Sequence, residues 1–148
     1  MMIVRDTREK EGHGWFFEES QYCEGTELKK LDSGDYSISG RESLVAIERK
    51  ENIVEFAQNL TQDRFERELE RMEQIAHPYV VLEFDFEDLV RYPHSAKLPP
   101  NIKQNIQISG QYLLRRLCEL QLKYKTKFIF AGKFGKQFTE SLFKRLNE

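Results

Sequence analysis

The sequence predicts an α/β domain in which a mixed β-sheet is flanked by helices on both sides. Short segments with the composition of strands fill the first third of the chain. Apolar residues at helical spacing follow, and two nearly continuous apolar runs stand between the helical segments. Strands joined by short turns favour an antiparallel part of the sheet, whereas strands separated by helices favour a parallel part.

The size and composition fit one globular domain over residues 1–148. Of these residues, 39% are hydrophobic and 32% are charged, which excludes a disordered chain. No apolar run approaches the roughly 20 residues that cross a bilayer, and the first residues lack the features of a secretion signal. The two cysteines, Cys23 and Cys118, stand far apart. We therefore expect a cytoplasmic protein without disulfides and without a membrane partner.

Four strands are expected in the first 50 residues. Met2 to Val4 is an apolar run that leads into polar residues, and Thr26 to Leu31 is a weaker candidate. A turn follows at Asp32-Ser33-Gly34. Residues 35–39 and 44–50 then form two strands joined by a short glycine-containing loop, which predicts a hairpin.

Helical periodicity begins after the hairpin. Apolar residues three and four positions apart predict helices over 53–60 and 65–76, and Pro78 is expected to end the second helix. The run 79–84 predicts a strand that is buried on both faces. Asp85 is placed to cap a short helix after that strand.

The last third contains the longest apolar stripe of the chain. The stripe predicts one helix over 102–124, and its members are Ile102, Ile106, Leu113, Leu117, Leu120 and Tyr124. This face is either part of the core or, with Leu114 beside it, a dimer surface. A buried strand over 128–131 and a final helix complete the domain.

Charged residues are divided unevenly along the chain. Residues 1–96 hold 12 Lys and Arg against 22 Asp and Glu, whereas residues 97–148 hold 11 against three. An acidic part could hold cations, and a basic part could contact phosphates. Because folding can scatter these residues, two ordinary solvated faces are an equally good interpretation.

The segment with the clearest chemistry is Asp35 followed by Glu48-Arg49-Lys50. Alternate side chains of a strand share a face, so Glu48 and Lys50 point one way and Arg49 points the other. A hairpin would bring Asp35 opposite Glu48. Two facing carboxylates suit a hard divalent cation, and a lysine beside them can orient a metal-bound water. On these residues alone, a surface strand with a salt-bridged Glu and Lys is the more frequent explanation.

Three polar motifs together resemble the nuclease domain of the XPF-type structure-specific endonucleases, which belong to the PD-(D/E)xK nucleases. The motifs are Asp6-Thr7-Arg8-Glu9, Gly34-Asp35-Tyr36 and Glu48-Arg49-Lys50. Later segments follow the same pattern, so the resemblance spans nearly the whole chain; they are Phe56, Leu60, Arg64, Phe65, Tyr79 to Glu83 and Phe130-Ala131-Gly132. The resemblance implies a restriction-endonuclease-like fold. It also implies a DNA endonuclease that depends on Mg²⁺ or Mn²⁺, cuts branched or flapped DNA in repair or recombination, and is a stand-alone bacterial or viral version of the domain.

The resemblance further implies catalytic roles for the central motif residues. Asp35 and Glu48 would bind the metal together with the backbone carbonyl of Arg49. Lys50 would position the attacking water. The expected reaction is hydrolysis of a phosphodiester by in-line attack.

The first motif is expected at the rim of the same site. Asp6 and Glu9 would act as metal ligands, directly or through water. Arg8 would steady the carboxylates or a phosphate, or would form a structural ion pair. The family usually places an Asp four residues after the lysine, where this chain has Val54. A register shift by one residue puts Glu55 in that place, and an ordinary surface residue is an equally good interpretation of Glu55.

No segment resembles the tandem helix-hairpin-helix module that cellular members of the family usually add. DNA affinity is then expected from the basic last third, from a partner protein or from a homodimer. Two alternatives stay open. The chain could be a non-catalytic nuclease-like subunit that binds DNA or a second chain, although such subunits generally lose the carboxylates and the lysine. It could also be a restriction or recombination nuclease of the wider group.

Overall fold

Six strands form one mixed sheet in the computed structural model, which describes residues 1–148. The strands are β1 (Ile3–Arg5), β2 (Thr26–Leu28), β3 (Tyr36–Ile38), β4 (Val45–Lys50), β5 (His77–Leu82) and β6 (Lys127–Phe130). Their order in the sheet is β2-β1-β3-β4-β5-β6. β3 pairs antiparallel with both β1 and β4, whereas β2 is parallel to β1, and β4, β5 and β6 are parallel to one another. The predicted mixed sheet and its hairpin are confirmed.

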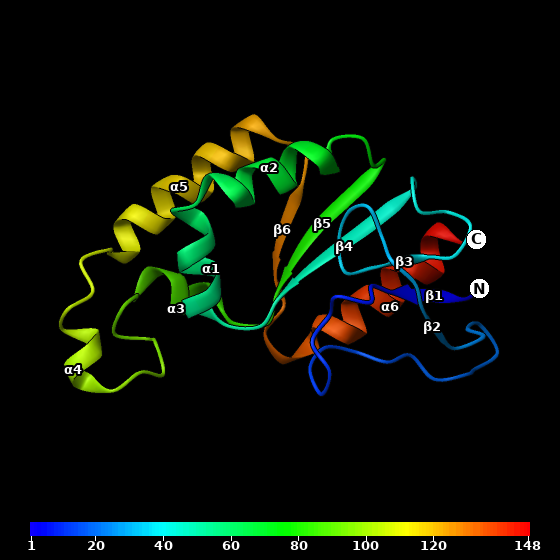
Figure 1. Cartoon of the computed structure of the whole chain (residues 1–148), viewed down its shortest axis with the longest axis horizontal. Helices are drawn as coiled ribbons and strands as arrows, with labels where there is room; N and C mark the ends of the chain where they lie inside the picture. Colours follow the sequence, from blue (N-terminus) through cyan, green and yellow to red (C-terminus); the bar gives the residue numbers. More distant parts are fainter.

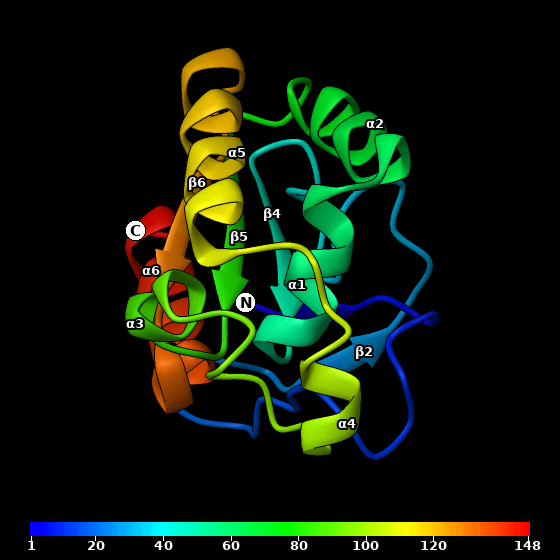
Figure 2. The ribbon, with the colours of Figure 1, turned by 90° about the vertical axis from the view of Figure 1, so that its left-hand side faces the viewer.

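Helices cover both faces of this sheet, as predicted. They are α1 (Ile53–Leu60), α2 (Asp63–Met72), α3 (Phe86–Val90), α4 (Pro100–Lys103), α5 (Gly110–Lys123) and α6 (Gly135–Leu146), with a 3-10 turn η1 (Gly132–Phe134) before α6. α1, α2, α3 and α5 lie on one side of the sheet and α6 lies on the other (Figures 1 and 2). None of these helices combines the length and the apolar character that crossing a membrane requires.

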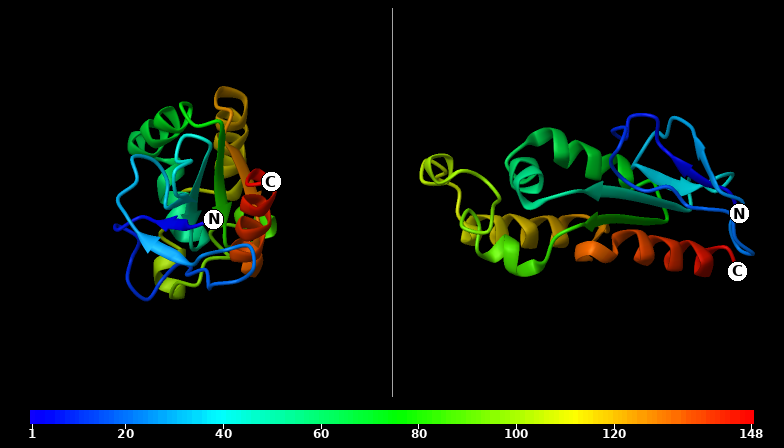
Figure 3. Two further views of the ribbon diagram at one scale, coloured as in Figure 1. Left: turned by 90° about the vertical axis from the view of Figure 1, so that its right-hand side faces the viewer. Right: turned by 90° about the horizontal axis from the view of Figure 1, so that it is seen from below.

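Each face of the sheet has its own hydrophobic core, and β4 contributes to both. Ala46 packs into the core under α1, α2 and α5, whereas Val45 and Ile47 pack into the core that includes Phe143 of α6. The predicted alternation along this strand is therefore confirmed. The irregular segment between β1 and β2 completes the second core with Trp15, Phe17 and Cys23. It runs back along the sheet, from Trp15, which contacts Glu83 beyond the end of β5, to Glu24, which pairs with Met1 near the two termini (Figure 3).

The single helix predicted over 102–124 is wrong in its first part. α4 ends at Lys103 and α5 begins only at Gly110, after Ser109, whose hydroxyl accepts a hydrogen bond from a backbone N–H of the first turn. A Cβ at position 110 would overlap the carbonyl oxygen of Val90 in α3. The start of α5 is determined by its close approach to α3 and by the Ser109 cap. The spacing of apolar residues reveals neither of these.

The structure decides one open alternative for the helices and corrects one expectation. Leu113 and Leu117 are buried in the core, so this part of the stripe is core and not a dimer surface. α2 ends at Met72 rather than at Pro78. The backbone N–H of Ala76 already donates to the loop before β4, so the chain joins the sheet before the proline, which lies inside β5.

Candidate active site

The turn before β3 brings Asp35 against the end of β4. Gly34 has φ +78°, and a Cβ there would lie 3.0 Å from the carbonyl oxygen of Ile47, so glycine is strongly favoured at this position. The N–H of Asp35 donates to the same carbonyl at 2.6 Å. The Asp35 Oδ2 accepts a hydrogen bond from the backbone N–H of Arg49 at 2.8 Å. These contacts hold the carboxylate of Asp35 beside the Glu48-Arg49-Lys50 segment.

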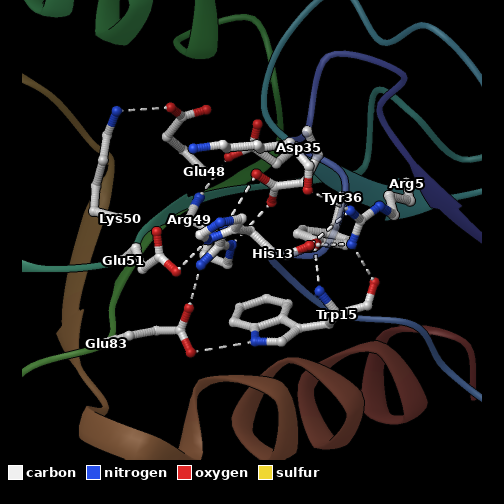
Figure 4. Close-up of polar contacts among 12 residues, drawn as sticks. Arg5, His13, Trp15, Asp35, Tyr36, Glu48, Arg49, Lys50, Glu51 and Glu83 are labelled. Carbon is white, nitrogen blue, oxygen red and sulfur yellow. Dashed lines mark hydrogen bonds and ion pairs between the residues drawn. The ribbon is translucent and has the colours of Figure 1, made fainter. Parts of the chain in front are cut away.

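Glu48 and Lys50 form an ion pair on the α2 side of the sheet. Lys50 Nζ lies 3.0 Å from Glu48 Oε2, and the two side chains are 8% and 15% exposed, respectively (Figure 4). The ammonium also lies 5.2 Å from the centre of the Phe65 ring. Burial opposes the charge on Lys50, but Glu48 outweighs it and raises the pKa of the ammonium. Lys50 is therefore charged and held in place.

The carboxyl groups of Asp35 and Glu48 lack enough neighbouring positive charge to offset the cost of their burial. Burial raises the pKa of Asp35 well above its ordinary value, and the charges of Glu48 and Glu9 raise it further. Burial also raises the pKa of Glu48, although Lys50 acts in the opposite direction. A bound cation would stabilise both groups in their ionised form.

Arg49 points to the opposite side of the sheet, as predicted, and is clamped between two carboxylates. Its Nε and Nη2 donate to Glu9 at 2.9 and 3.2 Å. Its Nη1 donates to Glu83 at 2.6 Å (Figure 4). The Arg49 side chain is 5% exposed. Glu83 follows β5 directly and also accepts a weak hydrogen bond from the indole of Trp15. Both carboxylate oxygens of Glu9 thus accept hydrogen bonds from Arg49, which holds Glu9 on the side of the sheet opposite to Glu48 and Lys50.

Asp6 is buried, and its carboxylate is occupied by protein donors. Oδ2 accepts from the backbone N–H and the Nε of Arg8, and Oδ1 accepts from Arg8 Nη2 and from the N–H of Leu31. Burial opposes the charge on Asp6, but these hydrogen bonds outweigh it and lower the pKa. The structure therefore uses Asp6 to hold Arg8 and the loop before β3. The hydrogen bond to Asp6 raises the pKa of Arg8, and the negative charges of Asp35 and Glu48 raise it further.

Glu55 lies at the beginning of α1. Its Oε1 accepts a hydrogen bond from the backbone N–H of Glu51 at 2.9 Å, and its own N–H donates to Asn52, the N-cap residue. This is the geometry of a helix cap. The negative charge of Glu55 contributes to the raised pKa of Lys50. Glu55 thus caps α1 at the edge of the site.

A small cavity opens beside Glu48 on the α2 side. Its volume is about 160 Å³, and it is bounded by the turn before β3 and by α2. Three arginines, Arg8, Arg64 and Arg71, line it together with Glu48 and Glu68. All three arginines belong to the part of the chain that carries most of the acids. Two cations of the basic last third, Arg116 and Lys123, are instead paired with Glu66.

The residues at the end of β4 fit a hydrated divalent cation. No group of three or more His, Cys, Asp or Glu side chains is arranged to hold a metal directly. Mg²⁺ commonly takes one or two protein carboxylates and keeps several waters, so Asp35 and Glu48 with a backbone carbonyl are a sufficient set. The pKa values of both carboxyls are raised by burial, which is a destabilisation that a cation relieves.

Sequence reasoning assigned no role to several residues that build the surroundings of the site. Arg5 is buried and donates to the carbonyls of Trp15, Lys10 and His13, which fixes the loop after β1. The hydroxyl of Tyr36 accepts a hydrogen bond from the N–H of Trp15, and their rings stack 4.8 Å apart. The only signal for this network in the sequence is the presence of Trp and Tyr near the polar motifs, and that does not specify partners.

A mixed sheet with a carboxylate–lysine site at the end of a central strand is the arrangement expected of the PD-(D/E)xK nuclease class. The chain belongs to the ERCC4 domain family, whose model matches residues 5–140. The resemblance predicted from the three motifs is thereby confirmed. Direct comparison with curated protein sequences gave no match.

Two solved structures of XPF from Aeropyrum pernix share the fold. One has a TM-score of 0.64 and the other, a complex with DNA, has 0.62, each at 17% sequence identity. Each match covers 99% of this chain, and it covers 65% and 64% of the respective XPF chains. The chain therefore spans somewhat less than two thirds of the length of these relatives, and the likeness establishes the fold.

Proposed function

We propose that the chain is a DNA endonuclease that depends on Mg²⁺ or Mn²⁺ and hydrolyses phosphodiester bonds, with branched or flapped DNA as the preferred substrate. The observation that carries the proposal is the meeting of Asp35, Glu48 and Lys50 in a buried corner that opens into an arginine-lined cavity. Membership of the ERCC4 domain family and the DNA complex of one structural relative support DNA as the substrate.

Asp35, Glu48 and the carbonyl of Arg49 would hold the divalent ion, which when bound supplies positive charge to the phosphate and acidity to water. Lys50 has one ammonium hydrogen directed to Glu48 and two left to donate. With these it holds the attacking water and favours the loss of its proton. Phe65 beneath the ammonium keeps Lys50 in position.

Arg64 and Arg71 of α2, with Arg8, would hold the DNA backbone next to the scissile bond. They line the cavity that Glu48 enters, and the Arg64 side chain is 81% exposed. Guanidinium groups bind phosphate oxygens through two parallel hydrogen bonds. This assigns phosphate binding to α2 in addition to the basic last third of the chain. Binding of branched DNA should weaken more than tenfold between low and moderately high salt, and each of the two α2 arginines replaced by alanine should reduce the salt slope by about 1.

A cleavage panel tests the proposal. Linear, flapped, forked and four-way DNA are incubated with the full chain in Mg²⁺, in Mn²⁺ and in chelator. Asp35→Asn and Lys50→Ala should each lower the cleavage rate by about 10²-fold or more, with the fold retained by circular dichroism. Glu87→Gln, an exposed carboxylate of α3, is the matched control and should cut like the parent.

The same panel separates the alternatives. Metal-independent cutting, or equal cutting by the parent and by Asp35→Asn, contradicts the assigned site. Binding of DNA without any cutting indicates a non-catalytic subunit, and cutting of linear duplex at preferred sequences indicates a restriction-type nuclease. We further propose that the active form is a homodimer or a complex with a partner protein, and sedimentation of the chain with and without branched DNA measures its oligomeric state.

A further inference from the structure

Glu68 of α2 carries a carboxylate oxygen that no protein group satisfies. Its Oε2 is shielded from solvent and has no hydrogen-bond partner. Its Oε1 lies 3.9 Å from the Nε of Arg64, whose side chain is 81% exposed, so this ion pair is weak. Lys50 is paired with Glu48 and not with Glu68. The inner oxygen of Glu68 therefore has no protein donor.

The position of Glu68 makes this oxygen costly for the fold. Glu68 lines the same cavity as Glu48, a second carboxylate. A shielded carboxylate oxygen without a donor destabilises a protein, and a like charge nearby adds to that effect. Met72, one turn further along the helix, shows that an apolar side chain is accommodated at this face.

We propose that Glu68 is a positioning residue of the hydrolytic site: its Oε2 accepts a hydrogen bond from a water molecule of the hydrated divalent cation that Asp35 and Glu48 hold. The inference rests on the function proposed above. The cavity of about 160 Å³ has room for about five waters at roughly 30 Å³ each. A carboxylate accepts from such a polarised water more strongly than an amide does. Glu68 thus adds a third negative side chain to the site without contacting the metal, and it holds water on the side from which α2 presents its arginines.

Mn²⁺ binding to the full chain, followed by the electron paramagnetic resonance of free Mn²⁺, tests this role without depending on catalysis. Glu68→Ala should weaken Mn²⁺ binding by about tenfold or more, because outer-sphere partners of a metal typically contribute that much. Glu68→Gln keeps the shape and one acceptor oxygen and should give an intermediate affinity. Glu70→Ala, an exposed carboxylate on the same helix, is the control and should bind Mn²⁺ like the parent.

Thermal unfolding without metal gives a second, opposite readout. Removal of an unpartnered carboxylate should leave the metal-free melting temperature of Glu68→Ala unchanged or raised, whereas the stabilisation by Mn²⁺ should shrink. A fall of several degrees in the metal-free protein, restored by Glu68→Gln together with the affinity, would identify a structural residue and overturn the inference.

The outcomes also distinguish this inference from the proposed function. If the parent binds Mn²⁺ and Asp35→Asn does not, but Glu68→Ala binds like the parent, the role of Glu68 is rejected and the metal site stands. If the parent and Asp35→Asn bind Mn²⁺ equally, or neither binds it, the metal site itself is rejected and the inference fails with it.

Discussion

Replacing Arg49 by methionine tests whether its ion pairs with Glu9 and Glu83, on the α6 side of the sheet, stabilise the domain. The guanidinium makes three hydrogen bonds to Glu9 and Glu83, at 2.9, 3.2 and 2.6 Å, and is 5% exposed. Removing the cation leaves two shielded carboxylates without their partner. Breaking a buried ion pair in this way costs about 3–5 kcal/mol. For a domain of this size, ~2–4 °C is lost per kcal/mol, so the melting temperature should fall by about 6–20 °C.

Urea unfolding at neutral pH, followed by circular dichroism, measures the change in the free energy of unfolding. The triple variant Glu9→Gln, Arg49→Met, Glu83→Gln is the matched control, because it removes the charges together and should recover most of the loss. Two results would show that these ion pairs do not stabilise the fold. One is a decrease in the free energy of unfolding of Arg49→Met below about 1 kcal/mol, and the other is the same decrease in the single and the triple variant.

Three other perturbations have expected outcomes. The hydrogen bond from Lys123 is the main cause that lowers the pKa of Glu66 to about 2. The resulting stability is present above the ordinary pKa of 4.5 and is lost as the pH falls toward 2, so Glu66→Gln should lose stability at neutral pH and flatten the acid limb of a plot of urea midpoint against pH. Gly110→Ala should cost about 1–3 kcal/mol in urea unfolding, because its Cβ overlaps the carbonyl oxygen of Val90. Burial raises the pKa of Asp35, so the folded protein loses stability as the pH rises from about 4 toward that raised value. In chelator, Asp35→Asn should be more stable than the parent by a margin that grows over this range and then stays constant, and a constant or shrinking margin between pH 4 and 8 contradicts the argument.

Most elements of this fold could be predicted because their signals are local. The helix over 53–60 has apolar residues at helical spacing and an Asn at its N-cap, and it was found with its observed bounds. The alternation that separates the two faces of β4 is also a property of a short segment. The break between α4 and α5 is different, because a contact of Gly110 with α3, twenty residues earlier in the chain, excludes a longer helix.

The site was predictable in its types of residue and less so in their partners. The spacing of Glu48 and Lys50 along a strand determines that they share a face, and the turn at Gly34 makes a hairpin partner for them. Glu83 pairs with Arg49 because β5 lies beside β4 in the sheet. This is a contact between residues far apart in the sequence, so a local pattern does not predict it. Glu68 could not have been assigned from its sequence, because an acid on the polar side of a helix is ordinarily solvated.

Hydrogen-bond saturation separates the structural carboxylates around β4 from those of the proposed metal site. Both oxygens of Asp6, Glu9 and Glu83 accept hydrogen bonds from protein donors, and these residues hold arginines or a loop in place. Asp35 and Glu48 instead have pKa values raised by burial, and Glu68 Oε2 has no donor at all. All of these acids lie close to one strand, so neither their number nor their position in the sequence distinguishes them. The first group is satisfied by the protein's own side chains, whereas the second group lacks compensating positive charge. This difference supports the proposal that Asp35, Glu48 and Glu68 surround a hydrated divalent cation.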